Sequence, residues 1–274
     1  MKKTKVIIPA LGILLLSTAA SVTGTVAWFS MNNAVTATGM RVQARVETGI
    51  VISTAANGSY GQKADLAQTE ATELYPSSTA NFTNWYHNNS NSDSVATGTG
   101  VVGEYESVSN STSATYYTVN EFYIRSSAYE EMTVNSLNVK SVSVTKADKT
   151  ASTDTLSKAL RVGVLFEGDT ATNKYYIFAP RLGAGESIGY TVAGTTAVTA
   201  ISGTLSQAEN APTFVQASAI TKIPGNTANG VSPNENPIHV YVYVWFEGED
   251  PECRSINITA SIEDLLVSVD FNYA

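Results

Sequence analysis

Apolar and polar residues alternate in short stretches along most of this 274-residue chain. From Met40 to Val46 apolar residues hold every second position, and Arg41, Gln43 and Arg45 stand between them. Alternation with a period of two places successive side chains on opposite faces of a β-strand. This segment is therefore predicted to be a strand with one face in a core and one face in solvent.

Similar stretches recur later in the chain. Residues 160–168 (LRVGVLFEG) and 174–180 (KYYIFAP) are separated by a short polar run, which predicts a β-hairpin. Residues 240–247 (VYVYVWFE) are apolar at both parities, which is typical of a central strand covered on both sides. Between Val139 and Val142 the apolar parity slips, which predicts a β-bulge or a turn.

The region from about residue 57 to residue 115 has a different pattern, because it is polar and rich in Gly, Ser and Asn. We expect an excursion from the main fold, made of loops and one or two short helices around residues 63–70 and 79–86. The aromatic residues of LYP (74–76) and NWYH (84–87) are expected to anchor this insertion by burial.

Many short strands separated by turn residues predict an all-β fold, an antiparallel β-sandwich of jelly-roll type. The composition agrees, since 43% of the residues are hydrophobic and only 15% are charged, and Ser, Thr, Asn and Gly fill the difference. Hydroxyl and β-branched side chains suit half-buried strands. We expect a single domain over residues 28–274, with the polar insertion inside it.

Residues 1–27 have the architecture of a secretory signal peptide: lysines in MKKTK, the apolar run VIIPALGILLL and the small-residue stretch STAASVTGTVA. Small side chains at Thr25 and Ala27 suit a signal peptidase, so cleavage is predicted between Ala27 and Trp28. The alternative is that the apolar segment, which is long enough to cross a bilayer, is retained as an anchor. Contact with a membrane is expected only through the uncleaved leader.

The junction GTVAWFSMNNAVTATG (residues 24–39) resembles the leader junction of the TasA and camelysin-like secreted proteins of bacteria. In that family a signal peptidase of the SipW type cuts just before an aromatic-containing strand. The matching residues here are Thr25, Val26 and Ala27 before the cut, and Trp28 and Phe29 after it. The resemblance implies a protein secreted by a Gram-positive bacterium to its extracellular matrix or cell surface, and self-association into fibres or biofilm matrix.

Fibres of the TasA type grow when each subunit donates its N-terminal strand to the next one, a form of β-augmentation. By this resemblance the donor strand would run roughly from Trp28 to Val46. Its apolar candidates for filling a groove are Trp28, Phe29, Met31, Val35, Met40 and Val42. The alternative is that the segment is simply the first strand of its own sandwich.

The formal net charge of −8 changes the list of partners. A negative surface repels phosphate backbones and anionic lipids, so nucleic acid is not an expected partner. The chain has one cysteine, Cys253, so no disulfide forms within it. We expect a reduced, partly buried thiol, with a disulfide between two chains as the alternative.

The sequence gives little support for the common secreted hydrolases. His87 and His239 are the two histidines, and there is no H-E-x-x-H. Residues 185–189 (GESIG) fit the letters of G-x-S-x-G, but the Gly-rich run GAGESIG is expected to be a hairpin connection rather than the strand-to-helix turn that this motif needs. Camelysin-like proteins have been described as metalloproteases, but no residue pattern here supports that activity. A non-catalytic protein is therefore predicted, although two carboxylates that meet only in the folded chain are compatible with a hydrolase.

The acidic run EGEDPE offers one candidate cation site. Its carboxylates belong to Glu247, Glu249, Asp250 and Glu252, and Ca²⁺ is bound by six to eight oxygen ligands. The spacing matches no EF-hand loop, so the favoured interpretation is a solvated turn that ends a hydrophobic strand. No other cofactor is predicted.

A second function remains open beside the structural one. Exposed aromatic rings can stack on sugars, and β-sandwiches often carry such sites. Trp85 and Tyr86 are the candidate stacking residues of an adhesin or carbohydrate-binding module, whose partner would be an extracellular glycan or protein.

Overall fold

The computed structural model describes residues 35–37, 40–67, 72–79, 82, 85–88, 105–107, 116–146, 156–167, 174–180, 187–192, 201–206, 214–216, 219–226, 236–248, 253 and 265–274. The elements are β1 (Val35–Ala37), β2 (Arg41–Val46), β3 (Ile50–Ser53), β4 (Lys63–Ala67), β5 (Thr72–Leu74), β6 (Ser78–Thr79), β7 (Trp85–Asn88), β8 (Tyr105–Ser107), β9 (Thr118–Ser126), β10 (Met132–Thr133), β11 (Leu137–Lys146), η1 (Leu156–Ala159), β12 (Leu160–Glu167), β13 (Lys174–Phe178), β14 (Ser187–Val192), β15 (Ile201–Ser206), β16 (Phe214–Gln216), β17 (Lys222–Ile223), β18 (Ile238–Phe246) and β19 (Leu265–Tyr273). Apart from the 3-10 turn η1, the named elements are strands, so the predicted all-β class is confirmed.

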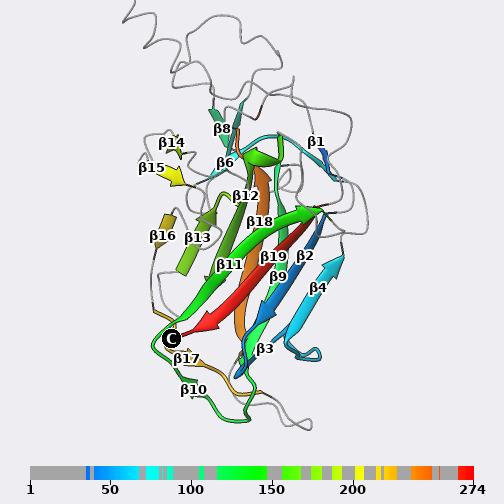
Figure 1. Ribbon diagram of the computed structural model, residues 1–274, viewed down its shortest axis with the longest axis vertical. Coiled ribbons are helices and arrows are strands. Elements are labelled where there is room, and N and C mark those ends of the chain that lie inside the picture. Colours follow the sequence, from blue (N-terminus) through cyan, green and yellow to red (C-terminus); the bar gives the residue numbers. More distant parts are fainter. Residues whose placement is uncertain are drawn as a thin grey trace, which may run out of the picture.

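Two large sheets face each other (Figure 1). The front sheet has the strand order β11-β19-β2-β4, and the back sheet has the order β16-β13-β12-β18-β9-β3. Neighbouring strands in both sheets are antiparallel, except that β2 and β19 are parallel. Smaller pairings join β1 to β5, β10 to β17, β14 to β15, and β6 to β7 and β8. The arrangement is therefore sandwich-like.

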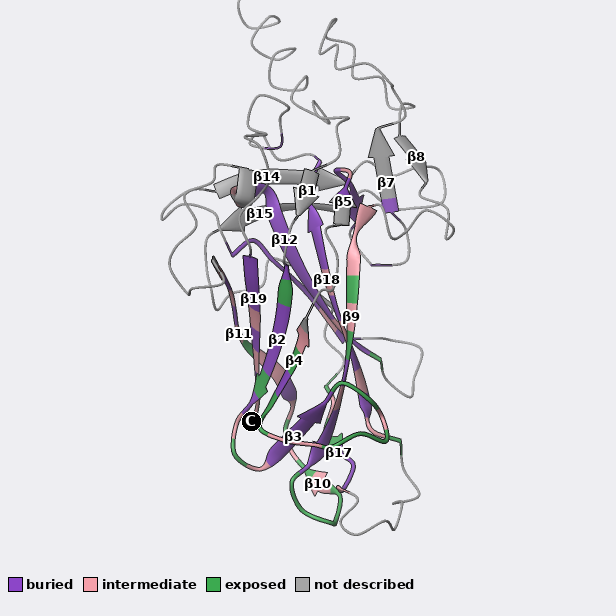
Figure 2. Ribbon diagram, turned by 90° about the vertical axis from the view of Figure 1, so that its right-hand side faces the viewer, coloured by how far each residue is buried: buried purple, intermediate pink, exposed green. Residues whose placement is uncertain are grey.

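The hydrophobic core lies between the two large sheets. Phe122 of β9, Val164 of β12 and Val242 of β18 point into it from the back sheet, and Val267 and Phe271 of β19 point into it from the front sheet. All five are at most 1% exposed. Figure 2 shows that β12 and β18, at the centre of the back sheet, are buried along most of their length. The alternating pattern of the sequence thus becomes one shared core.

The strand predicted around residues 40–46 is confirmed as β2, and it lies inside the front sheet between β19 and β4. Met40, Val42, Ala44 and Val46 are each at most 8% exposed and belong to the core. Within this chain, therefore, β2 is a strand of its own sandwich.

Three predictions from local pattern are confirmed. β12 and β13 form the expected antiparallel hairpin pair. The register of β11 against β19 shifts between Val139 and Ser141, where the parity slips. β18 is central, with β12 and β9 on its two sides. Its outer face is less covered than predicted, because Trp245 is buried whereas Tyr241 and Tyr243 are half-buried.

The short helices predicted in the insertion are wrong. Residues 63–67 form β4, an edge strand of the front sheet, while residues 78–79 form β6 and residues 85–88 form β7. In β4, Ala64 is buried, while Lys63 and Asp65 are exposed and form an ion pair of 2.7 Å. The side chains therefore follow a period of two, which the polar composition had obscured. Residues 89–104 of the insertion lie outside the described residues.

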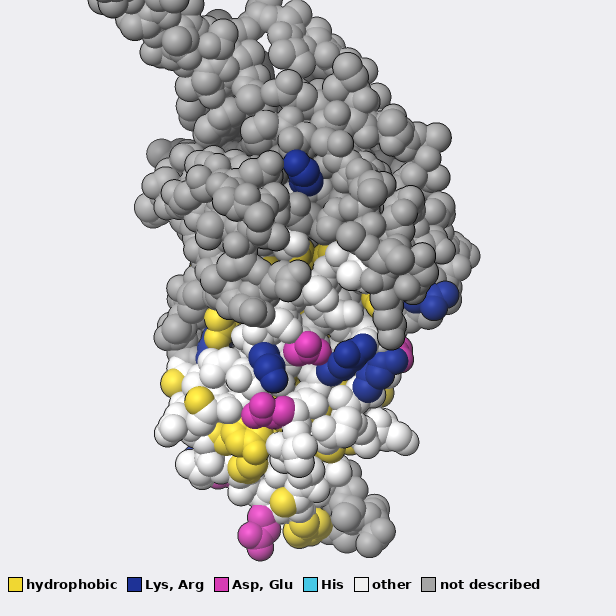
Figure 3. All heavy atoms as spheres, in the orientation of Figure 1, with side chains coloured by type: hydrophobic (Ala, Val, Ile, Leu, Met, Phe, Trp, Pro, Cys, Tyr) yellow, Lys and Arg dark blue, Asp and Glu magenta, His cyan; other side chains and the backbone are white. Residues whose placement is uncertain are grey.

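The outer face of the front sheet is polar. The Gln43 amide donates to Asp65 at 2.7 Å, and the Arg45 guanidinium donates to the Gln43 carbonyl oxygen at 2.8 Å. Charged side chains of both signs stand together on this face in Figure 3. The mixed charges indicate a solvated surface.

No helix in the described part of the chain is both long and apolar enough to span a bilayer. The predicted leader, residues 1–27, and its cleavage site between Ala27 and Trp28 lie outside the described residues.

The burial pattern of β9 predicts a sharp contrast between its two faces. Phe122→Ala removes a ring that is 0% exposed, and we expect it to lower the free energy of unfolding by about 3–5 kcal/mol. Val119→Ala, at a position that is 46% exposed on the same strand, should change it by less than about 0.5 kcal/mol. Urea denaturation of both variants measures the difference. Equal losses in the two variants would show that β9 does not have its inner face in the core.

Candidate functional site

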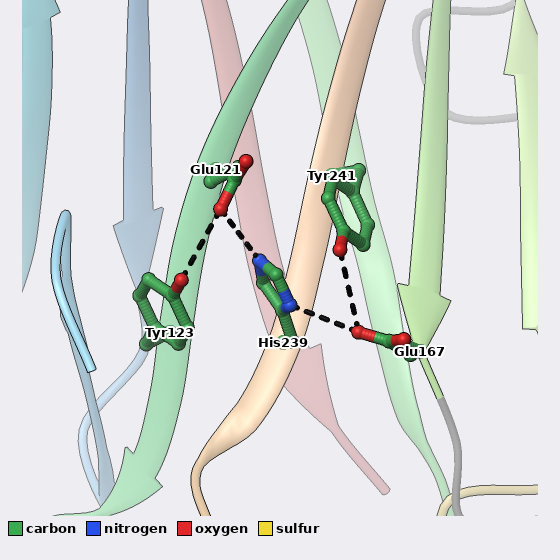
Figure 4. A network of polar contacts seen from close by, with 5 residues as sticks. All are labelled: Glu121, Tyr123, Glu167, His239 and Tyr241. Carbon is green, nitrogen blue, oxygen red and sulfur yellow. Dashed lines mark hydrogen bonds and ion pairs between the residues drawn. The ribbon is translucent and has the colours of Figure 1, made fainter.

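The outer face of the back sheet carries a row of aromatic and acidic side chains. Strand pairing builds it, because His239 of β18 lies directly between Tyr123 of β9 and Glu167 of β12. Two residues along β18, Tyr241 lies opposite Glu121 of β9. Residues two apart in a strand share a face, so all five side chains stand on the same surface. We call Glu121, Tyr123, Glu167, His239 and Tyr241 the polar strip (Figure 4).

The histidine is the centre of the polar strip. Its Nε2 lies 3.0 Å from Glu121 Oε2, and its Nδ1 lies 2.9 Å from Glu167 Oε2. A neutral imidazole has one N–H and donates to one carboxylate at a time, whereas the protonated ring donates to both. The arrangement therefore places an imidazole in hydrogen-bond contact with two carboxylates at the surface.

Two tyrosines complete the network. The Tyr123 hydroxyl donates to Glu121 at 3.2 Å, and the Tyr241 hydroxyl donates to Glu167 at 3.4 Å. The ring of His239 is stacked on Tyr123 at 4.5 Å between centroids and lies 4.1 Å from Tyr241. Burial, followed by the charges of Glu167 and Glu121, raises the pKa of Tyr241 to about 12. Its hydroxyl thus remains a donor at neutral pH.

The polar strip continues into a buried aromatic cluster, Phe82, Trp85, Tyr117, Tyr243 and Trp245, with Tyr175 at its side. Phe82 stacks on Tyr243 at 4.9 Å, and Trp85 stacks on Tyr117 at 4.0 Å. Trp85 and Trp245 meet edge to face at 5.4 Å. These rings cover one end of the outer face, and the polar strip occupies the end that remains open.

Gly163 of β12 makes room for the cluster. A Cβ at this position would lie 2.2 Å from the Phe82 ring, so a side chain there would displace Phe82. Phe82 itself has a positive φ of 58°, which is uncommon for a residue with a side chain. Its amide donates to Thr79 Oγ1 at 3.0 Å, and its carbonyl accepts from the Trp85 indole at 3.2 Å. These contacts hold the ring over the sheet.

The structure does not place Trp85 in a ligand site. It is 4% exposed, Tyr117 stacks on its ring, and Phe82 and Trp245 pack against it at an angle, so the prediction of an open stacking ring is wrong for Trp85. It acts instead as an anchor of the insertion, which was the other expectation. The side chains of Tyr86 and His87 lie outside the described residues.

The acidic turn also differs from its favoured interpretation. Glu247 is 1% exposed rather than solvated. Its carboxylate accepts from the Ser78 hydroxyl, and from the Trp245 indole at 3.1 Å. Glu249, Asp250 and Glu252 lie outside the described residues, and no group of three potential metal ligands occurs in the described part. The Glu247 carboxylate thus links Ser78 of β6 to the Trp245 indole of the aromatic cluster.

The predicted assembly residues divide into two groups. Val35 begins β1, which pairs with β5, and Met40 and Val42 are 2% and 3% exposed in the core. Trp28, Phe29 and Met31 lie outside the described residues. Cys253 is 0% exposed, more deeply buried than predicted, so the thiol is not accessible to another chain in this conformation.

The sequence singled out His239 as one of two histidines, but it singled out none of the four other residues of the polar strip. Glu121 and His239 are 118 positions apart, and Glu167 and His239 are 72 apart, so only strand pairing brings them together. The available signal was parity, because His239 shares its face with Tyr241 and Tyr243.

Comparison of the chain with protein-family models, with curated proteins and with solved structures finds no match in any of the three.

Tyr176, which is buried, and Tyr243, which is half-buried, predict how stability depends on alkaline pH. Burial raises the pKa of Tyr176 and Tyr243 from 10.0 to about 12. Between these values the unfolded chain has lost phenolic protons that the folded chain retains, so the free energy of unfolding should fall as pH rises. Denaturant titrations across this range, compared with those of the double variant Y176F/Y243F, measure the effect. A fall equally steep in the variant would contradict the assignment.

Proposed function

We propose that this protein is a secreted, non-catalytic structural subunit of extracellular fibres, matrix or cell surface, whose copies are joined by exchange of the N-terminal strand. The observation that supports it is the position of β2. The first strand of the front sheet is not at an edge but is inserted between β19 and β4. A strand at the start of the chain that fills the middle of a sheet leaves, when it is withdrawn, a slot of its own shape.

The slot would bind a strand by two kinds of contact. Both edges of β2 are paired, from Arg41 to Val46 with β19 and from Arg41 to Arg45 with β4. The apolar side of the strand places Met40, Val42, Ala44 and Val46 in the core. A second copy offers the same strand, so exchange conserves these contacts while joining two chains.

The connection between β2 and β3 suits a hinge. It consists of Glu47, Thr48 and Gly49, and Gly49 has a positive φ of 107°. Short connections of this kind favour exchange, because a turn of three residues can open into an extended link without changing either strand. Donation from each copy to the next is a head-to-tail contact, which produces an open chain of subunits.

The leader and the resemblance to TasA and camelysin-like proteins support secretion and therefore an extracellular partner. The acidic composition disfavours nucleic acid as that partner. The jelly-roll form of the sandwich belongs to the same proposal. The donor would include residues 28–39 ahead of β2.

A disulfide placed between β2 and β4 distinguishes exchange from an ordinary intramolecular strand. Ala44 and Ala64 are opposite each other on these antiparallel strands, with Cβ atoms expected about 4.5–5.5 Å apart, close to the range for a disulfide. The variant A44C/A64C, combined with Cys253→Ala, would be concentrated under reducing conditions and then oxidised. Exchange predicts a ladder of covalently joined chains on a non-reducing gel.

The control is the same variant oxidised at high dilution before it is concentrated. Each chain should then lock its own β2 and remain monomeric until reductant is added. If concentrated protein gives only the intramolecular disulfide, β2 stays in its own sheet and the proposed mode of assembly is wrong.

A second candidate function is glycan binding at the polar strip. The observation that favours it is the exposure of the acids, whose side chains are 50% exposed in Glu121 and 54% in Glu167. Open carboxylates and a phenol can accept and donate hydrogen bonds to sugar hydroxyls. The same exposure argues against a hydrolase, since catalytic preorganisation acts in sites that exclude water.

Affinity electrophoresis in gels containing neutral polysaccharides tests this candidate. If the polar strip binds sugar, the double variant E121Q/E167Q should lose retardation at least about tenfold, because charge-assisted hydrogen bonds are the stronger ones. Lys63→Gln, on the opposite face, is the matched control and should bind as the unmodified chain does. Unchanged retardation of the double variant would remove the polar strip as the binding surface.

A further inference from the structure

Lys174, at the start of β13, is a buried lysine without an acidic partner among the described residues. It is 3% exposed. Its Nζ donates to Ser136 Oγ at 2.7 Å, to the Leu137 carbonyl at 2.7 Å and to Asn138 Oδ1 at 2.8 Å. All three acceptors are neutral oxygens. Burial of a charge without a counter-charge is costly, and it lowers the pKa of the Lys174 ammonium.

The side-chain amide of Asn138 is held from several sides. Its Oδ1 also accepts from the Ser136 hydroxyl at 3.1 Å and from the Tyr176 hydroxyl at 3.3 Å. Its Nδ2 donates to the Ser136 carbonyl at 3.2 Å. Because burial raises the pKa of Tyr176 to about 12, that hydroxyl keeps its proton at neutral pH. Hydrogen-bond donors on a carbonyl oxygen make its carbon more electrophilic and stabilise negative charge on the oxygen.

We propose that Lys174 and Asn138 react to form an intramolecular amide bond between Nζ and the Asn138 Cγ, with release of ammonia. Nζ lies 2.8 Å from Oδ1, and a C=O bond is about 1.2 Å long, so Cγ lies within roughly 4 Å of Nζ. Rotation about χ2 of Asn138, a torsion with a broad energy minimum, turns the face of the amide toward the amine.

The step balances without a redox partner or cofactor. The neutral form of Nζ attacks Cγ, and a tetrahedral carbon forms with its oxygen facing the hydroxyls of Ser136 and Tyr176. The bond from Cγ to Nδ2 then breaks, and Nδ2 leaves as ammonia with a proton that originates on Nζ. Ser136 Oγ, which lies 2.7 Å from Nζ, is placed to relay that proton. Asn138 is only partly buried, so ammonia has a route to solvent.

The product would tie the two sheets together. β13 belongs to the back sheet and β11 is the edge strand of the front sheet. The bond would close a loop across 36 positions of sequence, which restricts the unfolded chain in the way that a disulfide does. In a chain whose single cysteine is buried, this would be a covalent brace that needs no thiol chemistry. The inference does not depend on strand exchange.

Intact-mass spectrometry of the purified full chain tests the proposal. We expect a mass lower than that of the sequence by one ammonia molecule. Tryptic digestion should then release peptide 126–140 joined to peptide 162–181, with no cleavage after Lys174, since the acylated lysine is no longer a trypsin site. Full sequence mass, with free peptides ending at Lys140 and Lys174, from folded protein after prolonged incubation at mildly alkaline pH would overturn it.

Two variants keep the result independent of folding. Lys174→Arg retains the charge and hydrogen-bond donors and should show the full sequence mass. Tyr176→Phe loses one donor to the Asn138 oxygen, and the linked fraction should accumulate about tenfold to a hundredfold more slowly, measured by mass at intervals after synthesis. Both should keep the circular dichroism spectrum of a β protein. Loss of ammonia in Lys174→Arg would place the reaction elsewhere and contradict the assignment.

Discussion

The insertion of β2 between β19 and β4 is the contact on which the rest of the structure depends. It joins the first strand of the front sheet to the last strand of the chain in parallel, and it places Met40, Val42, Ala44 and Val46 in the common core. Without it the front sheet would be divided, and both exposed edges would lack main-chain partners. Pairing of β2 on both sides therefore keeps the front sheet continuous, and under the proposed strand exchange the same contacts would join two copies.

The two outer faces of the sandwich have different chemistry. The front sheet presents mixed charges that hydrogen bond to one another, as in Arg45, Gln43 and Asp65. The back sheet presents aromatic rings, covered at one end by Phe82 and Trp85 and open at the other end around His239. Gly163 permits the cover, since any side chain there would meet the Phe82 ring. Of the two outer faces, the back sheet is therefore the better candidate for binding a ligand, because its aromatic and acidic side chains are open around His239.

Local pattern was sufficient for the strands and insufficient for the site. Alternation predicted β2, the β12–β13 pair and the bulge near Val139, because each depends on residues close in sequence. It failed for β4, where polar composition hid a period of two, and for Trp85, whose burial depends on rings from distant strands. The polar strip and the contact between Lys174 and Asn138 arise from pairings over long sequence distances, and parity within one strand shows which side chains share a face but not which strand lies beside it.

Strand exchange and the proposed amide bond between Lys174 and Asn138 would both strengthen a fibre. Strand exchange would join the subunits, and the amide bond would hold each subunit together under load. The most direct test of strand exchange is negative-stain electron microscopy of concentrated protein that begins at Trp28. Strand exchange predicts filaments whose axial repeat equals the length of one sandwich domain. Uniform single particles at every concentration would contradict it and would return β2 permanently to its own sheet.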